Sequence, residues 1–371
     1  MYARSASTVT SKFQDGTDYM PLGAIGPVAG LGWSDTMPGG PDTMQLTVRV
    51  APDLVQPQAL DAGRIVEVWR GGICQWEGVL DQPTPGDGGW SVTAKGAGTY
   101  GDNYRDIWTT WTDINTSLTQ ATSRSPGPLR WKLATYSNTN LYLVDQQQSG
   151  TETITDRLNL ATKPGYYTWH VGRRNLLSIF PVPTAVTRIL FSSSPQARSL
   201  AGYYNALYVL YQSAADNADT GAAAVNSLTS ATNTASIARH GRQEQLWDIT
   251  GAGTLSGGTA LGWAAAAITR YNAASYAGPI PVTYGAYTDV TGVPVDLGCE
   301  HAGEVAQLVL ADGPYGPEVS AFPPVTFPVG KFEYDEDSES GNVYPYNVLP
   351  NDLGALLDSM AIWLPKPPVT G

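Results

Sequence analysis

The sequence has almost no cysteine. Only Cys74 and Cys299 occur among 371 residues, and they lie far apart along the chain. So few thiols exclude a disulfide framework and a zinc site built from paired cysteines. We expect two separate thiols, each buried or half-buried in the fold.

Histidine is nearly as scarce, which narrows the catalytic possibilities. The sequence offers only His170, His240 and His301, and it contains no G-x-S-x-G elbow, P-loop or HExxH motif. His170 follows Trp169 in an apolar run and is expected to pack within a strand. His240 lies in a polar bend, where bonding to the backbone or to Glu244 is expected.

His301 is the histidine with neighbours that could share a metal ion. Cys299, Glu300 and Glu304 lie within three residues of it. A His/Glu pair at this spacing meets one metal only on a helix, and the flanking glycines indicate a turn instead.

An alternating acidic run lies near the end of the chain, formed by Glu333, Asp335, Asp337 and Glu339. The run lacks the glycine and the terminal bidentate position of an EF-hand, so a solvated hairpin tip is favoured over a calcium site. We therefore expect no catalytic residue, no cofactor and no metal, in a protein that is not an enzyme.

Long hydrophobic runs are absent. No segment approaches the roughly 18 apolar residues that a membrane-spanning helix needs. The N-terminus MYARSASTVTSK also lacks the apolar core of a signal peptide. We expect a soluble protein that is made in the cytoplasm and has no membrane span.

Charged residues make up 15% of the chain and are unevenly distributed. Residues 1–200 carry 16 acids and 16 bases, whereas residues 201–371 carry 17 acids and 5 bases, so the net charge of −12 lies in the second half. An acidic half disfavours nucleic acid as its partner. It suits a docking or pore-lining surface, with plain solubility as the alternative.

Glycine, proline and large aromatic residues are abundant instead. The chain has 40 Gly, 27 Pro, 11 Trp and 20 Tyr. This composition is typical of a turn-rich, mainly β protein, and Tyr and Trp are enriched at the centres of protein interfaces. The length predicts two or three domains.

Residues 62–98 predict a three-stranded meander. Two apolar runs, 65–69 and 73–79, flank Arg70-Gly71-Gly72, and a third run covers 90–94. The paired glycines supply the positive φ of a tight hairpin. A polar arm to about residue 30 and a strand pair at 31–33 and 44–50 precede this meander.

Residues 100–190 predict an α/β insertion. Apolar residues at helical spacing indicate a helix over 107–118, and Thr153 with Asp156 resembles a capping signature for a second helix. A hairpin follows, with strands at 166–171 and 176–180.

Beyond residue 200 the sequence predicts β structure again. We expect a strand over 203–212, a long exposed loop over 213–236 and a strand over 245–250. A helix then begins near Ser256. Its apolar face is expected to contain Leu261, Ala264, Ala265, Ile268 and Tyr271. Short strands are expected at 282–290, 293–297, 305–311, 329–335 and 343–346, followed by an amphipathic segment at 353–364.

The two halves of the chain echo each other. Residues 63–68 (GRIVEV) resemble residues 303–308 (GEVAQL), and a strand pair around a polar turn closes each half. A duplication would let three chains build a ring with six nearly equivalent positions.

Five segments, taken in order, resemble a tail-tip or baseplate hub protein of a long-tailed bacteriophage, also called a minor tail protein. The segments are WSDTMPGG at 33–40, VEVWRGGICQWEGVL at 66–80, the hairpin around Trp169, ARHGRQE at 238–244 and GKFEYDEDSES at 330–340. The resemblance covers about residues 30–350.

The resemblance implies a mainly β fold with α+β insertions, built from two related β-barrel domains. Along the chain it implies an N-terminal arm (1–30), part of a first hub barrel (31–99), the insertion (100–190), a second hub barrel with a helix and an Ala/Ser-rich loop (191–350) and a C-terminal segment (351–371).

The resemblance also implies a function without catalysis. A homotrimer would form the hub at the distal end of the tail and join the sixfold tail tube to the threefold tip around a channel. Its partners would be the distal tail protein, the tape measure protein and tip or receptor-binding proteins. DNA would pass through the channel without specific binding, and the protein would reside in the virion. No enzymatic extension follows the second barrel, so any tip enzyme would be another chain.

Several aromatic residues are candidates for the subunit or partner interface. They are Trp69, Trp76, Trp108, Trp111 and Tyr203. The alternative function is a polysaccharide-binding or polysaccharide-cleaving β-protein, in which exposed aromatic rings stack on sugars.

Overall fold

The computed structural model describes residues 6–50, 56–104, 131–134, 153–162, 167–192, 198–199, 204–213, 225–248, 254–271, 275–276, 279–310 and 325–346. The chain divides into two compact units. The first unit contains residues 1–195 and 278–346, and the second contains residues 196–277 together with 347–371. The hub-domain boundaries expected from the sequence stay predictions. The mainly β class is confirmed.

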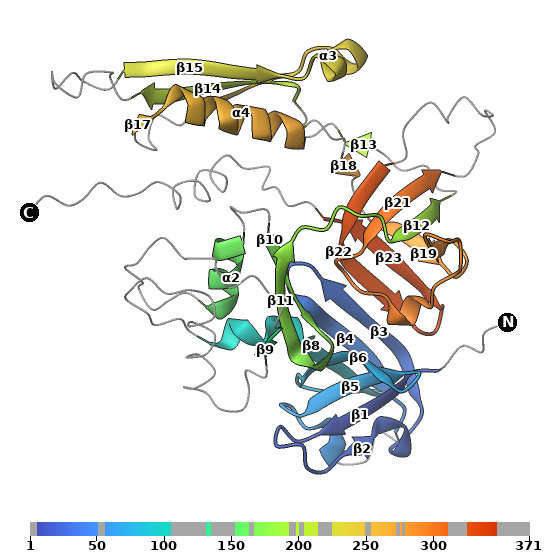
Figure 1. The fold of residues 1–371 in the computed structure, drawn as a ribbon. Coiled ribbons are helices and arrows are strands. Elements are labelled where there is room, and N and C mark those ends of the chain that lie inside the picture. The colour runs from blue at the N-terminus through green and yellow to red at the C-terminus, as the bar shows by residue number, and fades with distance from the viewer. Residues whose placement is uncertain are drawn as a thin grey trace, which may run out of the picture. The chain divides into compact units, whose positions relative to one another are not determined.

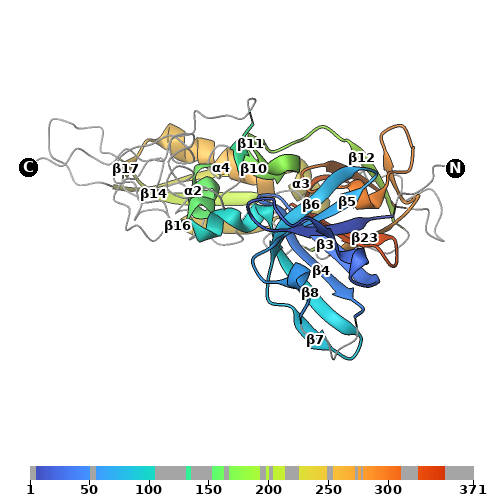
Figure 2. The ribbon, with the colours of Figure 1, turned by 90° about the horizontal axis from the view of Figure 1, so that it is seen from below.

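The first unit contains a large sheet of 14 strands (Figure 1). Its first half comprises β1 (Thr8–Lys12), β2 (Met20–Pro21), β3 (Val28–Thr36), β4 (Gly40–Val48), β5 (Ile65–Arg70), β6 (Ile73–Leu80), β7 (Thr84–Gly86) and β8 (Gly89–Gly96). Short 3₁₀ helices lie at η1 (Leu22–Ala24), η2 (Gln58–Leu60) and η3 (Ala97–Asn103). Figure 2 shows β4 and β8 side by side, with β7 at the end of β8.

The predicted meander is confirmed. β5 pairs antiparallel with β6 through the Gly71-Gly72 turn, and β6 pairs antiparallel with β8. Both turn glycines have positive φ, +57° and +77°, which side chains with a Cβ rarely adopt. Trp76 at the centre of β6 is 1% exposed, so the meander forms part of the core rather than a surface ribbon.

The segment predicted as an N-terminal arm contains a strand of the sheet. β1 pairs with β5 along its whole length, and Val9 and Ser11 are buried. The polar composition of this segment suggested an exposed arm, but its serine is buried with a hydrogen-bond partner. Ser11 Oγ donates to the carbonyl of Ala59 at 2.7 Å. A hydrogen-bonded serine can be buried without a large desolvation penalty.

The second half of the chain continues the same sheet. It comprises β12 (Arg188–Ser192), β19 (Ile280–Thr283), β20 (Tyr287–Asp289), β21 (Val305–Leu310), β22 (Val325–Asp335) and β23 (Ser340–Pro345), with η7 at Leu297–Cys299. β22 pairs antiparallel with β3, and this pairing joins the two halves edge to edge. Closure of either half into a barrel stays a prediction.

Two of the later strand predictions are wrong. The strand expected over 282–290 is split into β19 and β20 at Gly285, which has a φ of +87°. The strand expected over 293–297 is absent, since Val293 instead closes a turn by donating to the carboxylate of Asp289 at 3.0 Å. Asp289 also accepts from Thr291, so one side chain organises the whole turn.

A turn of the same geometry precedes β5 and β21. Gly63 and Gly303 have φ values of +86° and +94°. The Gly63 amide donates to the carbonyl of Leu80, and the Gly303 amide donates to that of Val329, both at 2.8 Å. The amides of Leu80 and Val329 then donate back to the residue after each glycine. The echo between the halves therefore has a structural counterpart.

The insertion packs a helix against a small sheet. It contains α2 (Ile154–Thr162), β9 (Lys132–Leu133), β10 (Tyr167–Gly172), η5 (Arg173–Asn175) and β11 (Leu176–Pro181). The predicted capping signature is confirmed: Thr153 Oγ1 accepts from the Asp156 amide, and Asp156 Oδ2 accepts from the Thr153 amide. The predicted hairpin is β10 and β11. The helix expected over 107–118 lies outside the described residues.

The second unit is a small sheet covered on one face by a helix. It contains β14 (Ala206–Ser213), β15 (Val225–Thr232), β16 (Glu244–Asp248), β17 (Thr254–Leu255), α3 (Thr234–His240), α4 (Gly257–Tyr271) and the pair β13 (Arg198–Ser199) and β18 (Ser275–Tyr276). Within its sheet the order is β15, β14, β16, with β17 also beside β14.

One prediction for the second unit is wrong, and another is confirmed in part. The long loop expected over 213–236 contains β15 and the start of α3, because the small polar residues of β15 pair along all of β14 and need little apolar area of their own. Among the α4 side chains that the structure describes, the predicted Ala264 and Ile268 are buried together with Ala260, whereas the predicted Leu261 and Ala265 are exposed. The stripe follows i, i+4, i+8 spacing. The segment expected at 353–364 lies outside the described residues.

Candidate functional site

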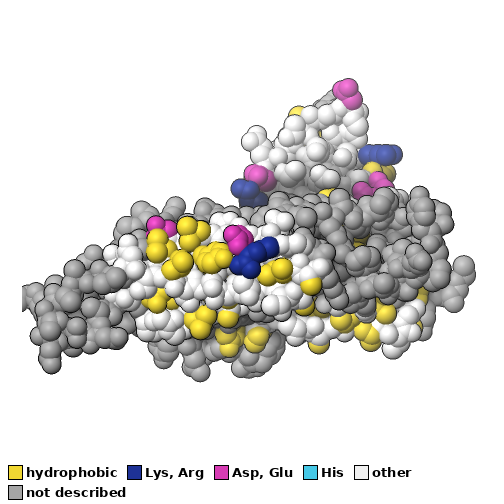
Figure 3. All heavy atoms as spheres, turned by 90° about the horizontal axis from the view of Figure 1, so that it is seen from above, with side chains coloured by type: hydrophobic (Ala, Val, Ile, Leu, Met, Phe, Trp, Pro, Cys, Tyr) yellow, Lys and Arg dark blue, Asp and Glu magenta, His cyan; other side chains and the backbone are white. Residues whose placement is uncertain are grey.

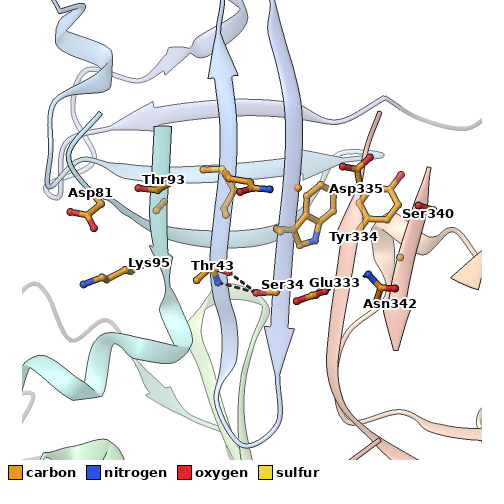
Figure 4. Close-up of a pocket in the computed structure, with 16 residues that line it drawn as sticks. Ser34, Thr43, Asp81, Thr93, Lys95, Glu333, Tyr334, Asp335, Ser340 and Asn342 are labelled. Atoms are coloured by element: carbon orange, nitrogen blue, oxygen red, sulfur yellow. Dashed lines mark hydrogen bonds between the residues drawn. The ribbon is translucent and has the colours of Figure 1, made fainter. Parts of the chain in front are cut away.

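An open groove of about 580 Å³ crosses the sheet where the two halves join. β8, β4, β3, β22 and β23 line it in that order (Figure 4). Register explains the row of polar side chains at its centre: Lys95 opposes Thr43, and Ser34 opposes Glu333, which opposes Asn342. Alternation along each strand points the side chains of their neighbours, which also line the groove, away from this row.

The groove floor is held by side-chain hydrogen bonds. Ser34 Oγ lies 2.8 Å from Thr43 Oγ1. Glu333 accepts from Tyr344 at 2.7 Å and lies 2.8 Å from Lys331. Burial opposes ionisation of Glu333, but these donors outweigh it and lower its pKa, while burial and the same carboxylate raise the pKa of Tyr344 to about 12. The groove thus presents fixed polar groups, and the charge of Glu333 among them is paired.

Two aromatic residues adjoin the groove, but their rings are buried and do not face the solvent. Trp33 and Tyr334 lie with ring centroids 4.7 Å apart and are each 4% exposed. A ring must expose its face to stack on a sugar. The groove therefore lacks the feature on which polysaccharide recognition by stacking depends.

Arg70 ties the first half of the sheet to the second. Its guanidinium is 2.8 Å from Asp296 and 2.8 Å from Glu336, and it also donates to Ser7 at 3.2 Å. The cation lies 5.6 Å from the ring centroid of Tyr334. The Arg70 side chain is 3% exposed, whereas those of Asp296 and Glu336 are 36% and 21% exposed, so a buried cation meets carboxylates that water partly screens.

A second junction gathers Asp35, His170 and His301. His170 Nε2 lies 2.7 Å from Asp35 Oδ1, His301 Nδ1 lies 3.5 Å from Asp35 Oδ2, and the Ala302 amide donates to Asp35 Oδ1 at 3.0 Å. The three residues come from β3, from β10 in the insertion and from the turn before β21. The sequence predicted packing for His170, but a carboxylate partner fixes its position instead.

The charges at this junction stabilise one another. Burial raises the pKa of Asp35, but the facing imidazoles outweigh burial and hold that pKa well below its usual range. Burial lowers the pKa of His170, and Asp35 outweighs it and raises the pKa. An opposite charge within hydrogen-bond distance favours both ionised forms. The junction is a buried ion pair that links three parts of the fold.

The two carboxylates near His301 form ion pairs with one arginine. Arg188 in β12 donates to Glu300 at 2.7 and 3.1 Å and to Glu304 at 3.2 Å. Burial raises the pKa of Glu300 in spite of this partner. Across the part of the chain that the structure describes, no group of three or more His, Cys, Asp or Glu residues is arranged to hold a metal ion.

The acidic run of β22 and its turn does not converge on one point. Asp335 accepts from Ser338 at 2.7 Å, and Asp337 accepts from the Gly30 amide at 2.9 Å. Glu333 belongs to the groove described above. Each carboxylate therefore has its own protein partner, in the hairpin tip that the sequence predicted.

The residues predicted for an interface have different surroundings. Trp76 is 1% exposed, and its indole donates to the carbonyl of Ser34 at 3.2 Å, so we assign it to the core of the subunit. Trp69 is half-buried and donates to Glu67 at 3.2 Å, and its contact role stays a prediction. Trp108, Trp111 and Tyr203 lie outside the described residues. Sequence reasoning missed Asp35 and Arg70, whose partners are remote in the chain.

Solved structures share this fold, although no family model and no curated protein matches the sequence. The 43 kDa tail protein of prophage MuSo2 from Shewanella oneidensis matches 92% of this chain and 99% of its own, with 12% identity and a TM-score of 0.58. A tail protein from Neisseria meningitidis MC58 matches 92% and 96%, with 10% identity and a TM-score of 0.56.

A third structure extends the comparison. Prophage tail protein gp18 from Listeria monocytogenes EGD-e matches 95% of this chain and 98% of its own, with 11% identity and a TM-score of 0.56. No helix in the described residues is long and apolar enough to cross a membrane. Over nearly its whole length, this chain has the fold of phage tail proteins.

Proposed function

We propose that this chain is a structural protein of a phage tail and that three copies form a hub at the distal end of the tail. The observation that carries the proposal is the match over nearly the full length of a prophage tail protein, 92% of this chain and 99% of the other. The hub would join the sixfold tail tube to the threefold tip around a channel.

The repeated turn supports the ring. The same backbone hydrogen bonds precede β5 and β21, so one chain carries two similar elements and three chains carry six. A closed ring of three subunits can then meet a sixfold partner at nearly equivalent positions. The distal tail protein is the expected sixfold neighbour, and the tape measure and tip or receptor-binding proteins are the expected axial ones.

The distribution of charge supports a channel lining. Residues 278–371 carry 13 acids and 2 bases, yet Asp296, Glu300, Glu304 and Glu336 are paired with arginines from earlier in the chain. The acids that no arginine pairs in this way include Asp337 at the exposed hairpin tip, whose negative charge would repel DNA in the channel. Replacing Asp337 and Glu339 with Lys should make the assembled hub retain DNA in a gel-shift assay, and unchanged mobility would argue against this lining.

The proposed role needs no catalysis. The imidazole of His170 is held by Asp35, and the carboxylates beside His301 are held by Arg188. A polysaccharide-cleaving protein would release reducing ends from cell-wall or capsule material. We expect none from the purified chain.

Light scattering of the purified full chain tests the hub. The expected mass is three times the 39.4 kDa of one chain, with the trimer favoured further when tail partners are added. A strict monomer at high protein concentration, even with those partners present, would contradict the proposal.

A further inference from the structure

A small cavity of about 90 Å³ lies in the first unit, beside the junction of Asp35, His170 and His301. Its lining comes from β3, from β6, from the hairpin of β10 and β11 with η5 at its turn, and from the turn before β21. A cavity of this size has room for about three water molecules, which is also enough for one tetrahedral oxyanion. Segments remote in the chain therefore enclose a space that a small polar ligand can fill.

Three buried polar atoms of this lining have no hydrogen-bond partner among the residues that the structure describes. They are Asp35 Oδ2, Gln75 Nε2 and His301 Nε2. Asp35 is 2% exposed and Gln75 is 3% exposed. Leaving buried polar groups unpaired is costly, so their convergence on one cavity indicates a ligand that supplies the missing partners.

The cavity asks its ligand for both a donor and an acceptor. Arg173 Nη2 donates to Gln75 Oε1 at 2.9 Å, and a guanidinium can only donate, so the free nitrogen of Gln75 is a donor. The facing imidazoles hold the pKa of Asp35 well below its usual range, so its free oxygen is an acceptor. The ligand must therefore carry a donor group next to an acceptor oxygen.

Two arginines line the cavity without a carboxylate of their own. Arg173 and Arg174 are exposed, and neither forms an ion pair with a described residue. In Figure 3 an exposed basic side chain lies against an acidic one amid hydrophobic side chains, and Arg242 forms such a pair with Glu244. The two arginines at the cavity have their charges available for a ligand.

The charges of the lining favour an anion. With His170 protonated and His301 left out of the count, three cations face two carboxylates, a net charge of +1; the groups are Arg173, Arg174 and His170 against Asp35 and Glu77. A cationic ligand could donate to Asp35, but this excess of positive charge would repel it. The ligand is therefore an anion that also carries a donor.

Irregular backbone places two of the lining side chains. Gln75 is the extra residue of a β-bulge in β6, where the pairing with β5 shifts between Val68 and Trp69. Bulges re-aim a side chain and are frequent beside functional sites. Arg174 has a φ of +60°, a conformation that a non-glycine residue adopts at a cost and that is often retained at ligand clamps.

We infer that this cavity binds a protonated phosphate, either the free ion or a phosphate monoester that retains one O–H. The O–H would donate to Asp35 Oδ2, a second oxygen would accept from Gln75 Nε2, and the remaining oxygens would face the two arginines. Sulfate has no O–H near neutral pH, so it would set a negative oxygen against Asp35. A phosphate diester such as the DNA backbone lacks the O–H as well. The inferred site does not depend on the proposed hub.

Calorimetric titration of the full chain with sodium phosphate and with sodium sulfate, at pH 6 and equal ionic strength, tests the site. Inorganic phosphate carries an O–H at this pH, and about half of a monoester does. We expect phosphate to bind at least about tenfold more tightly than sulfate, because a ligand without the O–H leaves a buried acceptor unpaired. No binding of phosphate, or equal binding of the two ions, would overturn the inference.

Glycerol 3-phosphate distinguishes the two sources of phosphate in the same titration. Binding within about fourfold of inorganic phosphate would extend the site to monoesters, since about half of the monoester has the required O–H at pH 6. Absence of binding would restrict the site to the free ion. Either result supports the cavity as a phosphate site.

Gln75→Leu tests the contact inside the cavity, because it removes the free amide and keeps a side chain of similar size. Phosphate affinity should fall by at least about tenfold. Without phosphate the variant should be no less stable than the native chain in urea, since an unpaired buried donor has been removed. Unchanged phosphate affinity in this variant would overturn the inference.

Arg174→Asn gives a second test at the surface. Asparagine tolerates a positive φ, so the fold is expected to be kept, while phosphate should bind about fivefold more weakly without this charge. Arg49→Asn is the matched control, because Arg49 is an exposed arginine outside the lining, and its loss should leave phosphate affinity unchanged. Equal weakening in both variants would show only a general attraction to basic side chains and would overturn the inference.

Discussion

His170 Nε2 lies 2.7 Å from Asp35 Oδ1, although 135 residues separate them in the chain. The bond joins β10 of the insertion to β3 of the large sheet. Asp35 also accepts from the Ala302 amide at the turn before β21. The buried Asp35 carboxylate therefore connects three parts of the fold, and its loss should destabilise the first unit as a whole.

Asp35→Ala should lower the free energy of unfolding by about 3 kcal/mol, since it leaves a buried imidazole without its partner. Urea unfolding followed by tryptophan fluorescence would measure this. Asp87→Ala, at an exposed turn, is the matched control and should change stability by no more than about 0.5 kcal/mol. Equal effects of the two substitutions would show that the junction contributes nothing.

The same junction predicts a pH window for stability. The pKa of His170 is raised above its ordinary 6.5, so its stabilisation is complete below that pH and is lost as pH rises through the folded pKa. The pKa of Asp35 is lowered from 3.8, so its stabilisation is present above that pH and is lost as pH falls through the folded pKa. Stability should peak between these limits in the native chain, and D35A should flatten the loss on the alkaline side. An unchanged profile in D35A would contradict this assignment.

Arg70→Met should destabilise the first unit by about 1.5 to 3 kcal/mol, because it removes the charge-assisted hydrogen bonds to Asp296 and Glu336, whose partial exposure limits the loss. Arg70→Lys keeps the charge but not the two-pronged geometry, so an intermediate loss is expected. Lys331→Met removes a pair in which both side chains are 33% exposed, and it should change stability by less than about 1 kcal/mol. Thermal melts of the three variants would rank them, and an R70M melt that matches K331M would refute the junction.

Gly63→Ala and Gly303→Ala should each destabilise by about 1 to 2 kcal/mol through backbone strain at positive φ. A Cβ at Gly63 would meet no neighbour within 4 Å, and one at Gly303 would meet only Met37 at 3.4 Å, so crowding contributes little. Gly88→Ala, also open but without positive φ, is the control. Similar decreases in the free energy of unfolding for Gly63→Ala and Gly303→Ala, with no decrease for Gly88→Ala, would support the equivalence of the two turns. Unequal decreases would contradict it.

Trp76→Ala should destabilise by about 3 to 5 kcal/mol, as expected for a large buried side chain. Ile73→Ala on the same strand removes a side chain that is 46% exposed and should change stability by less than about 1 kcal/mol. If both variants lost only assembly and kept full stability, Trp76 would be an interface residue after all.

Cys74 and Cys299 should resist alkylation in the folded protein. Burial, with Glu67 and Glu77 nearby, raises the pKa of Cys74 to about 12, and burial also raises the pKa of Cys299. Little thiolate is then present at pH 8. Mass spectrometry after iodoacetamide treatment should show much faster modification in urea, and equally rapid labelling of the native chain would contradict the raised pKa values of these half-buried thiols.

Local patterns predicted much of the fold. The Gly71-Gly72 turn placed β5 and β6 to within a residue, and Thr153 with Asp156 placed the start of α2. These signals work because a turn or cap is decided by a few neighbouring residues. β15 was missed because its stability comes from pairing with β14, which composition does not reveal.

The junctions could not be predicted in the same way. Asp35, His170 and His301 meet only after three remote segments fold together, and nothing near any of them indicates the others. Arg70 closes the hairpin that the sequence did predict, yet its partners Asp296 and Glu336 lie in the other half. Pairings at such separation depend on the topology of the sheet rather than on local preference.

Electron microscopy of the purified full chain tests the central claim most directly. The hub predicts class averages with threefold symmetry and a central hole, because three chains would surround a channel. Particles of one chain without a ring, under conditions in which the tail partners are also present, would contradict the proposed hub.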